Sequence, residues 1–242
     1  MKIMVYGKEF ARVYDEKWTV WGAKMWPFLF KVVKEKHPDA ATWLDLCCGT
    51  GALLEYVTKR GFDGVGVDVS PHQIKIAKYR APKAHFYVDD VRDLNLSKKI
   101  DIITCTYDSL NYLIKKRDLE RVFRRAGLHL EKRGIFIFDM NTFEGLQEKW
   151  RDTYIMRESS KTIIIEASFQ KKRAIGKCLI TGFIKDGRLY RKFEEIHIER
   201  GYSRKDIEQS LAKTGFLFKI YDGDTFKKPT AQSGRLVYVC QR

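Results

Sequence analysis

The residues best suited to chemistry lie in one short run, Asp45-Leu-Cys-Cys-Gly-Thr-Gly51, between an apolar segment and a second segment with a helical pattern. Glycines in such a turn let the backbone approach a ligand closely, and the N–H groups that start the following helix can bind a carboxylate. Asp45 stands four residues before Gly49, where it would repel a pyrophosphate. The run therefore predicts a nucleotide-like ligand that carries positive charge.

Two further acidic positions follow the next two expected strands. A carboxylate at Asp68 can accept hydrogen bonds from both hydroxyl groups of a ribose. Asp89 and Asp90 come after the third strand, where a carboxylate can accept from the exocyclic amine of adenine while the N–H of Val91 meets a ring nitrogen. Each position is weak evidence alone, since Asp68 is also explained as a neighbour of the helix cap Ser70. Together they predict contacts along the length of one bound cofactor.

These residues need a scaffold that brings the ends of several strands together. From Trp43 to Asp139, strand-like and helix-like segments alternate, which predicts a mainly parallel sheet with helices on both faces. Ligands bind at the carboxyl ends of the strands in such a sheet. The strands are expected at residues 42–46, 64–69, 84–88, 100–106 and 135–138.

After Trp150 the hydrophobic period changes. Alternation over residues 163–169, followed by strand-like runs on either side of Asp186-Gly187, predicts antiparallel strands with a tight hairpin. The chain then returns to an α/β pattern, with a helix capped by Ser203 and two strands at 216–221 and 236–240. The expected fold is α/β, a Rossmann-like seven-stranded sheet formed by residues 1–150 and 201–242. Residues 151–200 are expected to form an inserted antiparallel β lid for the substrate.

Taken together, these motifs resemble those of the class I S-adenosylmethionine-dependent methyltransferases, whose first motif is acid-x-Gly-x-Gly-x-Gly. The resemblance covers Thr42 to Asp139, with Cys47 where the family has its first glycine. It implies S-adenosyl-L-methionine as the cofactor. The implied contacts are Asp45 with the methionine amino group, Gly49 and Gly51 with the amino-acid moiety, Asp68 with the ribose and Asp90 with the adenine. Further positions expected around the cofactor are Tyr14, Cys47, Val69, Asp89, Val91 and Thr106.

Methyl transfer from a sulfonium is an in-line displacement, so the protein supplies alignment, desolvation and sometimes a base. Asp108 and Asn141, after the fourth and fifth strands, are the predicted acceptor contacts, as base or orienter. Capping of a loop explains each of them equally well. His197 is the third predicted catalytic residue, because Glu195 and Glu199 on the same strand face would raise its affinity for a proton. An exposed, charged sheet face is the favoured alternative explanation there.

Two segments are expected to cover the site, the N-terminal run and the insertion. The run from Phe10 to Asp15 resembles the leading segment of small-molecule methyltransferases, and the face of Tyr14 can stabilise a sulfonium. Ordinary helix packing explains Trp18 and Trp21 equally well. The insertion's Glu-Glu-x-His pattern resembles a poorly characterised prokaryotic branch, similar in layout to glycine and sarcosine N-methyltransferases.

Composition limits the size of the domain, the kinds of partner and the expected location of the protein. The chain has 242 residues, of which 44% are hydrophobic, enough for the core of one domain. Its net charge of +15 is scattered along the sequence, which favours a solvated surface over a nucleic-acid interface. Five cysteines without a Cys-x-x-Cys pair predict free thiols and no metal site. No apolar run could span a membrane or serve as a signal peptide, so a cytoplasmic protein is expected.

The sequence thus predicts an S-adenosylmethionine-dependent methyltransferase that acts on a nitrogen or oxygen atom of a small molecule. An RNA methyltransferase is the second hypothesis, favoured by the net charge and by the basic residues between 115 and 133. A non-catalytic S-adenosylmethionine-binding protein, which would need nothing at Asp108 or Asn141, is the third. Whether the chain forms a homodimer stays open, and the sequence does not reveal the acceptor.

Overall fold

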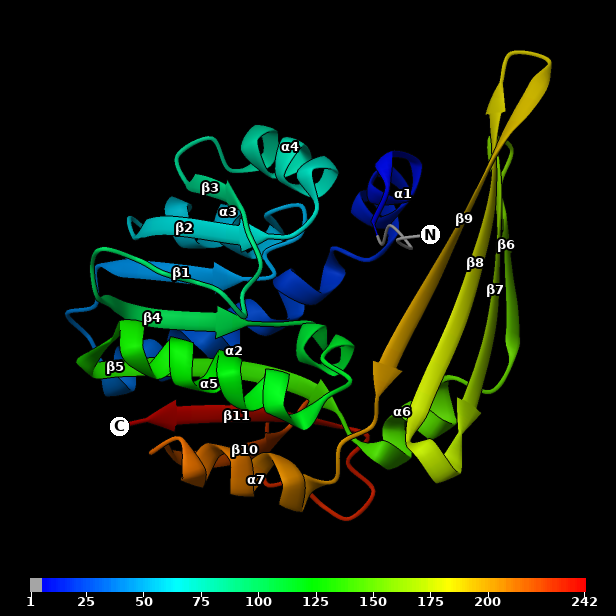
Figure 1. The fold of residues 1–242 in the computed structure, drawn as a ribbon. Helices are drawn as coiled ribbons and strands as arrows, with labels where there is room; N and C mark the ends of the chain where they lie inside the picture. The colour runs from blue at the N-terminus through cyan, green and yellow to red at the C-terminus, as the bar shows by residue number, and fades with distance from the viewer. Residues whose placement is uncertain (1–5) are drawn as a thin grey trace.

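The computed structural model describes residues 6–242, which form two separate sheets (Figure 1). In the seven-stranded sheet the order is β10-β11-β5-β4-β1-β2-β3, and every pairing is parallel except the two that β11 makes. This arrangement confirms the predicted Rossmann-like α/β class. The strands of this sheet are β1 (Thr42–Leu46), β2 (Asp63–Asp68), β3 (His85–Val88), β4 (Ile100–Cys105), β5 (Leu130–Asn141), β10 (Leu217–Asp222) and β11 (Arg235–Gln241).

Apolar residues alternate along the central strands and form two clusters, one on each face of this sheet. In β1, Leu44 and Leu46 belong to one cluster, whereas Trp43 belongs to the other. Phe136 and Ile137 of β5 divide in the same way. Helices cover both faces of the sheet (Figure 1), and apolar side chains pack on each face. Polar groups with a function are therefore left to the ends of the strands. The helices are α1 (Lys8–Lys17), α2 (Val20–Lys36), α3 (Ala52–Lys59), α4 (Pro71–Arg80), α5 (Lys116–His129), α6 (Phe143–Lys149) and α7 (Arg204–Lys213), with short 3₁₀ turns η1 (Ser109–Tyr112) and η2 (Lys171–Arg173).

The second sheet is antiparallel, with the order β6-β7-β8-β9. It stands beyond the carboxyl ends of the core strands, and α1 lies between it and α4 (Figure 1). Phe10 and Val13 of α1 pack with Ile163, Cys178 and Ile180 of the sheet. The N-terminal helix therefore lies between the core and the lid. The strands are β6 (Thr153–Arg157), β7 (Lys161–Gln170), β8 (Ile175–Asp186) and β9 (Leu189–Arg200).

The structure differs from the sequence-based expectation in two strands. β5 is longer than predicted at both ends, because β4 pairs with it from Leu130 and β11 pairs with it as far as Asn141. β6 was not predicted; it is an edge strand whose residues are mostly exposed, so it lacks the alternation that marks a half-buried strand. The predicted hairpin is present, with Gly187 in the left-handed region at φ +62°. No helix within residues 6–242 combines the length and apolarity needed to cross a membrane.

Candidate active site

A cleft of about 280 Å³ opens at the carboxyl ends of β1, β2 and β3. These strands are parallel neighbours, so residues that directly follow them meet at one edge of the sheet. The cleft brings together most of the residues predicted around the ribose and adenine. Those that line it are Tyr14, Cys47, Gly49, Asp68, Val69, Asp89, Asp90 and Val91.

Asp68 ends β2 and joins the glycine turn to the start of α4. Its Oδ2 atom accepts a hydrogen bond from the Gly49 N–H at 3.0 Å, and its Oδ1 atom accepts one from the Ser70 N–H at 2.8 Å. Burial raises the pKa of Asp68, and these backbone donors oppose the rise. Asp68 therefore holds the turn before α4, whose N-cap is Ser70, and also faces the cleft. Each carboxylate oxygen can accept a second hydrogen bond, which leaves room for two ribose hydroxyls.

Asp90 is paired with the neighbouring Arg92 in the structure. Its carboxylate accepts from the Arg92 side chain at 2.9 and 3.0 Å, and also from the Arg92 backbone N–H at 3.0 Å. These hydrogen bonds lower the pKa of Asp90. Arg92 lines the same cleft. An adenine amine at this place would have to share the carboxylate with Arg92.

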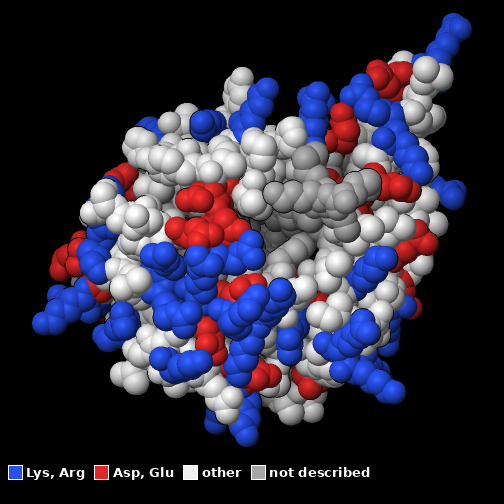
Figure 2. All heavy atoms as spheres, viewed as in Figure 1, with Lys and Arg blue, Asp and Glu red and all other residues white. Residues whose placement is uncertain are grey.

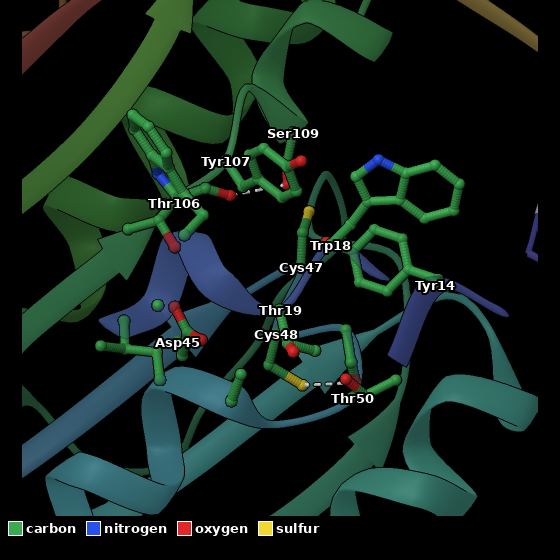
Figure 3. Close-up of a pocket in the computed structure, with 15 residues that line it drawn as sticks. Tyr14, Trp18, Thr19, Asp45, Cys47, Cys48, Thr50, Thr106, Tyr107 and Ser109 are labelled. Carbon is green, nitrogen blue, oxygen red and sulfur yellow. Dashed lines mark hydrogen bonds between the residues drawn. The ribbon is translucent and has the colours of Figure 1, made fainter. Parts of the chain in front are cut away.

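Asp45 lines a second, smaller cavity of about 40 Å³ (Figure 3). Its Oδ1 atom accepts from the Thr104 hydroxyl at 2.7 Å. Burial raises the pKa of Asp45 to about 7; the Thr104 hydrogen bond opposes this rise and the nearby Asp68 carboxyl adds to it. Figure 3 shows Asp45 and Thr106 on one side of this cavity and Tyr14 on the other. A buried acid with a raised pKa favours a ligand that brings a cation.

The turn itself has an unusual backbone. Cys47, Gly49 and Gly51 all have positive φ, at +55°, +55° and +76°. Cys47 thus adopts a left-handed conformation that glycine takes without strain and that costs other residues about 1–2 kcal/mol. Gly51 lines none of the three cavities described for residues 6–242; instead, a Cβ there would lie 3.0 Å from the Cβ of Ala77. Gly51 therefore allows α3 and α4 to approach each other closely.

One buried polar atom supports the fit of S-adenosylmethionine to these two cavities. Gln73 is 2% exposed and lines the larger cleft, and within the described chain its Oε1 atom has no hydrogen-bond partner. A buried acceptor of this kind needs a donor. An N–H or O–H group of the cofactor would supply that donor, just as a cationic group would suit Asp45.

A third cavity, of about 410 Å³, lies between the core and the antiparallel sheet. The three predicted catalytic residues, Asp108, Asn141 and His197, all line it. Tyr14 and Tyr107 line all three cavities, so the third one adjoins the two that fit the cofactor. Much of its wall is aromatic, from Tyr6, Phe10, Trp18, Trp21, Tyr112 and Trp150.

Asp108 and Asn141 are held in a network of charges. Asn141 donates its side-chain N–H to Asp108, and the Arg235 guanidinium donates to Asp108 at 2.7 Å and to Asp139. The carboxylate of Asp139 also accepts from the backbone N–H groups of Tyr107 and Asp108, at 2.6 and 3.1 Å. These contacts hold Tyr107 and Asp108 in a strained turn, with φ of +64° and +50°. Asp108 is thus already paired, which favours an orienting role over that of a base.

His197 is buried, at 3% exposure. Its Nδ1 atom lies 2.8 Å from the Tyr112 hydroxyl, and its Nε2 atom lies 3.4 Å from Glu195. The favoured interpretation of this strand face as exposed was wrong, because α1 packs against it. The Glu195 carboxylate accepts from the N–H groups of Tyr6 and Gly7, at 2.7 and 2.6 Å. This contact ties the N-terminal segment to the lid.

Sequence reasoning missed several residues of the site. Arg235 was missed because it stands at the start of β11, distant in sequence from both of its acidic partners, and no motif marks it. Its guanidinium also lies 4.3 Å from the ring centre of Trp21 and 5.5 Å from that of Tyr107. Trp18 and Trp21 were attributed equally to packing, yet both line two of the cavities. No group of three or more metal-binding side chains occurs in the part of the chain that the structure describes.

Comparisons with known proteins agree with this geometry. Residues 44–134 match the family described as "Methyltransferase domain". Magnesium-protoporphyrin O-methyltransferase of Rhodobacter capsulatus is 30% identical over 158 residues, which cover 62% of this chain and 69% of that protein. A solved structure of an S-adenosylmethionine-dependent methyltransferase from Clostridium acetobutylicum ATCC 824 has a TM-score of 0.85 at 27% identity, and covers 96% of this chain and 97% of its own. The chain belongs to the class I S-adenosylmethionine-dependent methyltransferases.

Two further relatives extend the likeness to almost the whole methyltransferase. "Putative methyltransferase YqeM" of Bacillus subtilis (strain 168) is 27% identical and covers 99% of this chain and 98% of its own length. dTDP-3-amino-3,4,6-trideoxy-alpha-D-glucopyranose N,N-dimethyltransferase of Streptomyces venezuelae is 24% identical and covers 79% of this chain and 82% of its own length. The likeness therefore includes the lid as well as the cofactor-binding core. S-adenosyl-L-methionine is the cofactor of this enzyme.

Proposed function

We propose that this methyltransferase transfers a methyl group to a nitrogen atom of a small polar molecule, held in the cavity between the core and the lid. The observation that carries the proposal is the cavity of about 410 Å³, which shares Tyr14 and Tyr107 with the cofactor cavities. A pocket bordered by a helix, core loops and a second sheet suits a molecule of about the size of a sugar better than a polymer. The amino-sugar N,N-dimethyltransferase among the relatives supports nitrogen as the acceptor atom.

The residues around the cavity have distinct proposed roles. S-adenosylmethionine, when bound, supplies an electrophilic methyl group on a sulfonium. Asp45 would bind its amino group, and the rings of Tyr14 and Tyr107 would exclude water where the cavities meet. Asp108 and Asn141 would orient the acceptor, because their own hydrogen bonds fix their positions. The Tyr112–His197 pair is placed to receive the proton that the nitrogen loses.

The proposal also covers the division of the chain into domains and its localisation. Residues 1–150 and 201–242 would bind the cofactor, residues 151–200 would carry the substrate, and the five free thiols suit the cytoplasm.

RNA is the competing acceptor. Figure 2 shows Lys and Arg side chains spread over the face that carries α5, with Asp and Glu among them. Several of them are paired, such as Lys116 with Asp206 and Arg121 with Asp93, which favours a solvated surface.

A labelled-methyl survey tests the proposal. The enzyme is incubated with a cell extract and S-adenosylmethionine labelled on its methyl group, and the extract is then separated into metabolite, RNA and protein fractions. Label is expected in amines of the metabolite fraction, and the Asp68→Ala variant is the inactive control. Label confined to RNA would contradict the small-molecule acceptor, and label confined to oxygen atoms of metabolites would contradict the choice of nitrogen.

A further inference from the structure

Glu199, on β9, faces the acceptor cavity with one oxygen of its carboxyl group left without a hydrogen bond from the described residues. The side chain is 3% exposed and lines the cavity. Within residues 6–242, its Oε2 atom has no hydrogen-bond partner. A buried carboxyl oxygen without a donor is costly, and such atoms are rare in folded proteins. The free atom therefore points to a ligand that donates a hydrogen bond.

The charges around Glu199 favour a cationic ligand. Among the residues that the structure describes, two cations line the cavity and both are engaged: Arg235 is shared by Asp108 and Asp139, and Lys149 donates to Asn141 at 3.1 Å. Burial raises the pKa of Glu199 well above its usual range, repulsion from Asp108 adds to the rise, and Arg235 opposes it. A cation that entered the cavity would offset this repulsion between the acids.

The wall beside Glu199 is aromatic. Glu199 pairs across the strands with Gly176, and the Trp150 ring fills the space where a Cβ of Gly176 would lie, with Cε3 2.6 Å from that position. Trp150 lines the same cavity. A carboxyl group beside an aromatic face suits a molecule with an ammonium group on an apolar frame.

We propose that Glu199 recognises the amino group of the acceptor, and that the acceptor is an aliphatic primary or secondary amine on a frame about the size of a sugar ring. This inference rests on the proposed function, because it identifies the group that receives the methyl. It assigns acceptor choice to the lid, whereas the core binds the cofactor.

The contact has a clear chemical role in the transfer. The bound ammonium first loses a proton to the Tyr112–His197 pair, which frees the nitrogen lone pair. This lone pair forms the new C–N bond as the C–S bond breaks, and the electron pair of the C–S bond stays on sulfur. Positive charge thus moves to the nitrogen, where the carboxylate of Glu199 stabilises it. The product is a methylated ammonium beside the Glu199 carboxylate, and the Tyr112–His197 pair returns its proton to solvent.

Calorimetric titration with two simple ring compounds tests this assignment. Cyclohexylamine and cyclohexanol, which share a ring but differ in charge, are titrated into the full-length enzyme saturated with S-adenosylhomocysteine. Glu199→Gln is the test variant, because Gln matches a neutral Glu in shape and cannot hold a negative charge. Glu194→Gln is the matched control, since Glu194 lies on the other face of β9, exposed and paired with Lys192 at 2.8 Å.

The wild-type enzyme is expected to bind cyclohexylamine more tightly than cyclohexanol. Glu199→Gln should weaken amine binding by about 30-fold or more and leave alcohol binding unchanged, whereas Glu194→Gln should behave as wild type. Glu199→Asp should recover part of the preference if Gln acts through charge rather than through misfolding. Equal binding of the two rings by wild type, or an unchanged preference in Glu199→Gln, would overturn the assignment. Failure of S-adenosylhomocysteine to bind would instead contradict the cofactor part of the proposed function.

Discussion

The cofactor region and the acceptor region lie side by side but are built in different ways. Around the cofactor cleft, Asp45 lies near the end of β1, Asp68 ends β2 and Asp90 follows β3. Asp68 and Asp90 each accept from a backbone N–H two residues away, whereas Asp45 accepts from Thr104, 59 residues away. In the acceptor cavity, Asp108 depends on Arg235 and His197 depends on Tyr112, which are 127 and 85 residues away in sequence. The first region is specified mostly by local contacts, and the second is specified by the packing of distant segments.

This difference suggests how the two regions can diverge. A local turn that binds the cofactor can stay constant while the insertion and the chain termini change around it. If so, substitutions in the acceptor network should affect stability most, and substitutions in the cofactor turn should affect binding most.

The largest effect is expected from Arg235→Met, which removes the cation shared by Asp108 and Asp139. Two buried carboxylates would lose their partner, so the free energy of unfolding should fall by about 3–5 kcal/mol. Denaturant unfolding measures this change. Arg151→Met is the control, because Arg151 is exposed and contacts only Asp152 among the ion pairs of the described chain, so a loss below about 0.5 kcal/mol is expected. A similar small loss for both variants would remove the distinction between the two regions.

Asp68→Ala should affect cofactor binding more than stability. It removes a carboxylate that accepts from the Gly49 and Ser70 N–H groups and faces the cofactor cleft, so affinity for S-adenosylmethionine should fall by about 100-fold. Calorimetric titration measures the affinity. Asp63→Ala, at the exposed start of the same strand, should leave it unchanged. Unchanged affinity in Asp68→Ala would remove the ribose assignment.

The same distinction explains what the sequence could predict. β1 was predicted to the residue, and the acids at its end and at the ends of β2 and β3 follow from strand and turn patterns alone. Tyr107 and Arg235 carry no such signal, because their roles depend on a contact between β11 and the turn after β4. The burial of His197 was also missed, since alternation along β9 shows that two faces differ but not which of them packs against α1.

Affinity for the cofactor should also depend on pH through Asp45. Burial raises its pKa from 3.8 to about 7, so the protonated form contributes stability that is present below about pH 3.8 and is lost as the pH rises through 7. A cationic ligand needs the ionised form. Affinity should therefore fall by up to tenfold for each pH unit below about 7. Titrations between about pH 5.5 and 7 measure the slope, and Asp45→Asn should bind weakly with a flat profile. A flat profile in the wild type would show that another group meets the cofactor's amino group.

The smallest effect concerns Cys47, the one departure from the family's glycine pattern. Its φ of +55° penalises any residue with a Cβ, so Cys47→Gly should be more stable than Cys47→Ala by about 1 kcal/mol, although both variants lose the thiol. Cys48 provides the matched control, because it is not among the residues with positive φ, and there glycine should be less stable than alanine by about 0.4–1 kcal/mol. Thermal unfolding of the four variants measures both differences. If the glycine variant is more stable than the alanine variant at Cys47 but less stable at Cys48, the backbone of this turn, rather than its side chains, requires the glycine-like conformation. The same sign at both would mean that the turn relaxes to accept Cys47 without strain, and that local specification of the cofactor region is weaker than its geometry indicates.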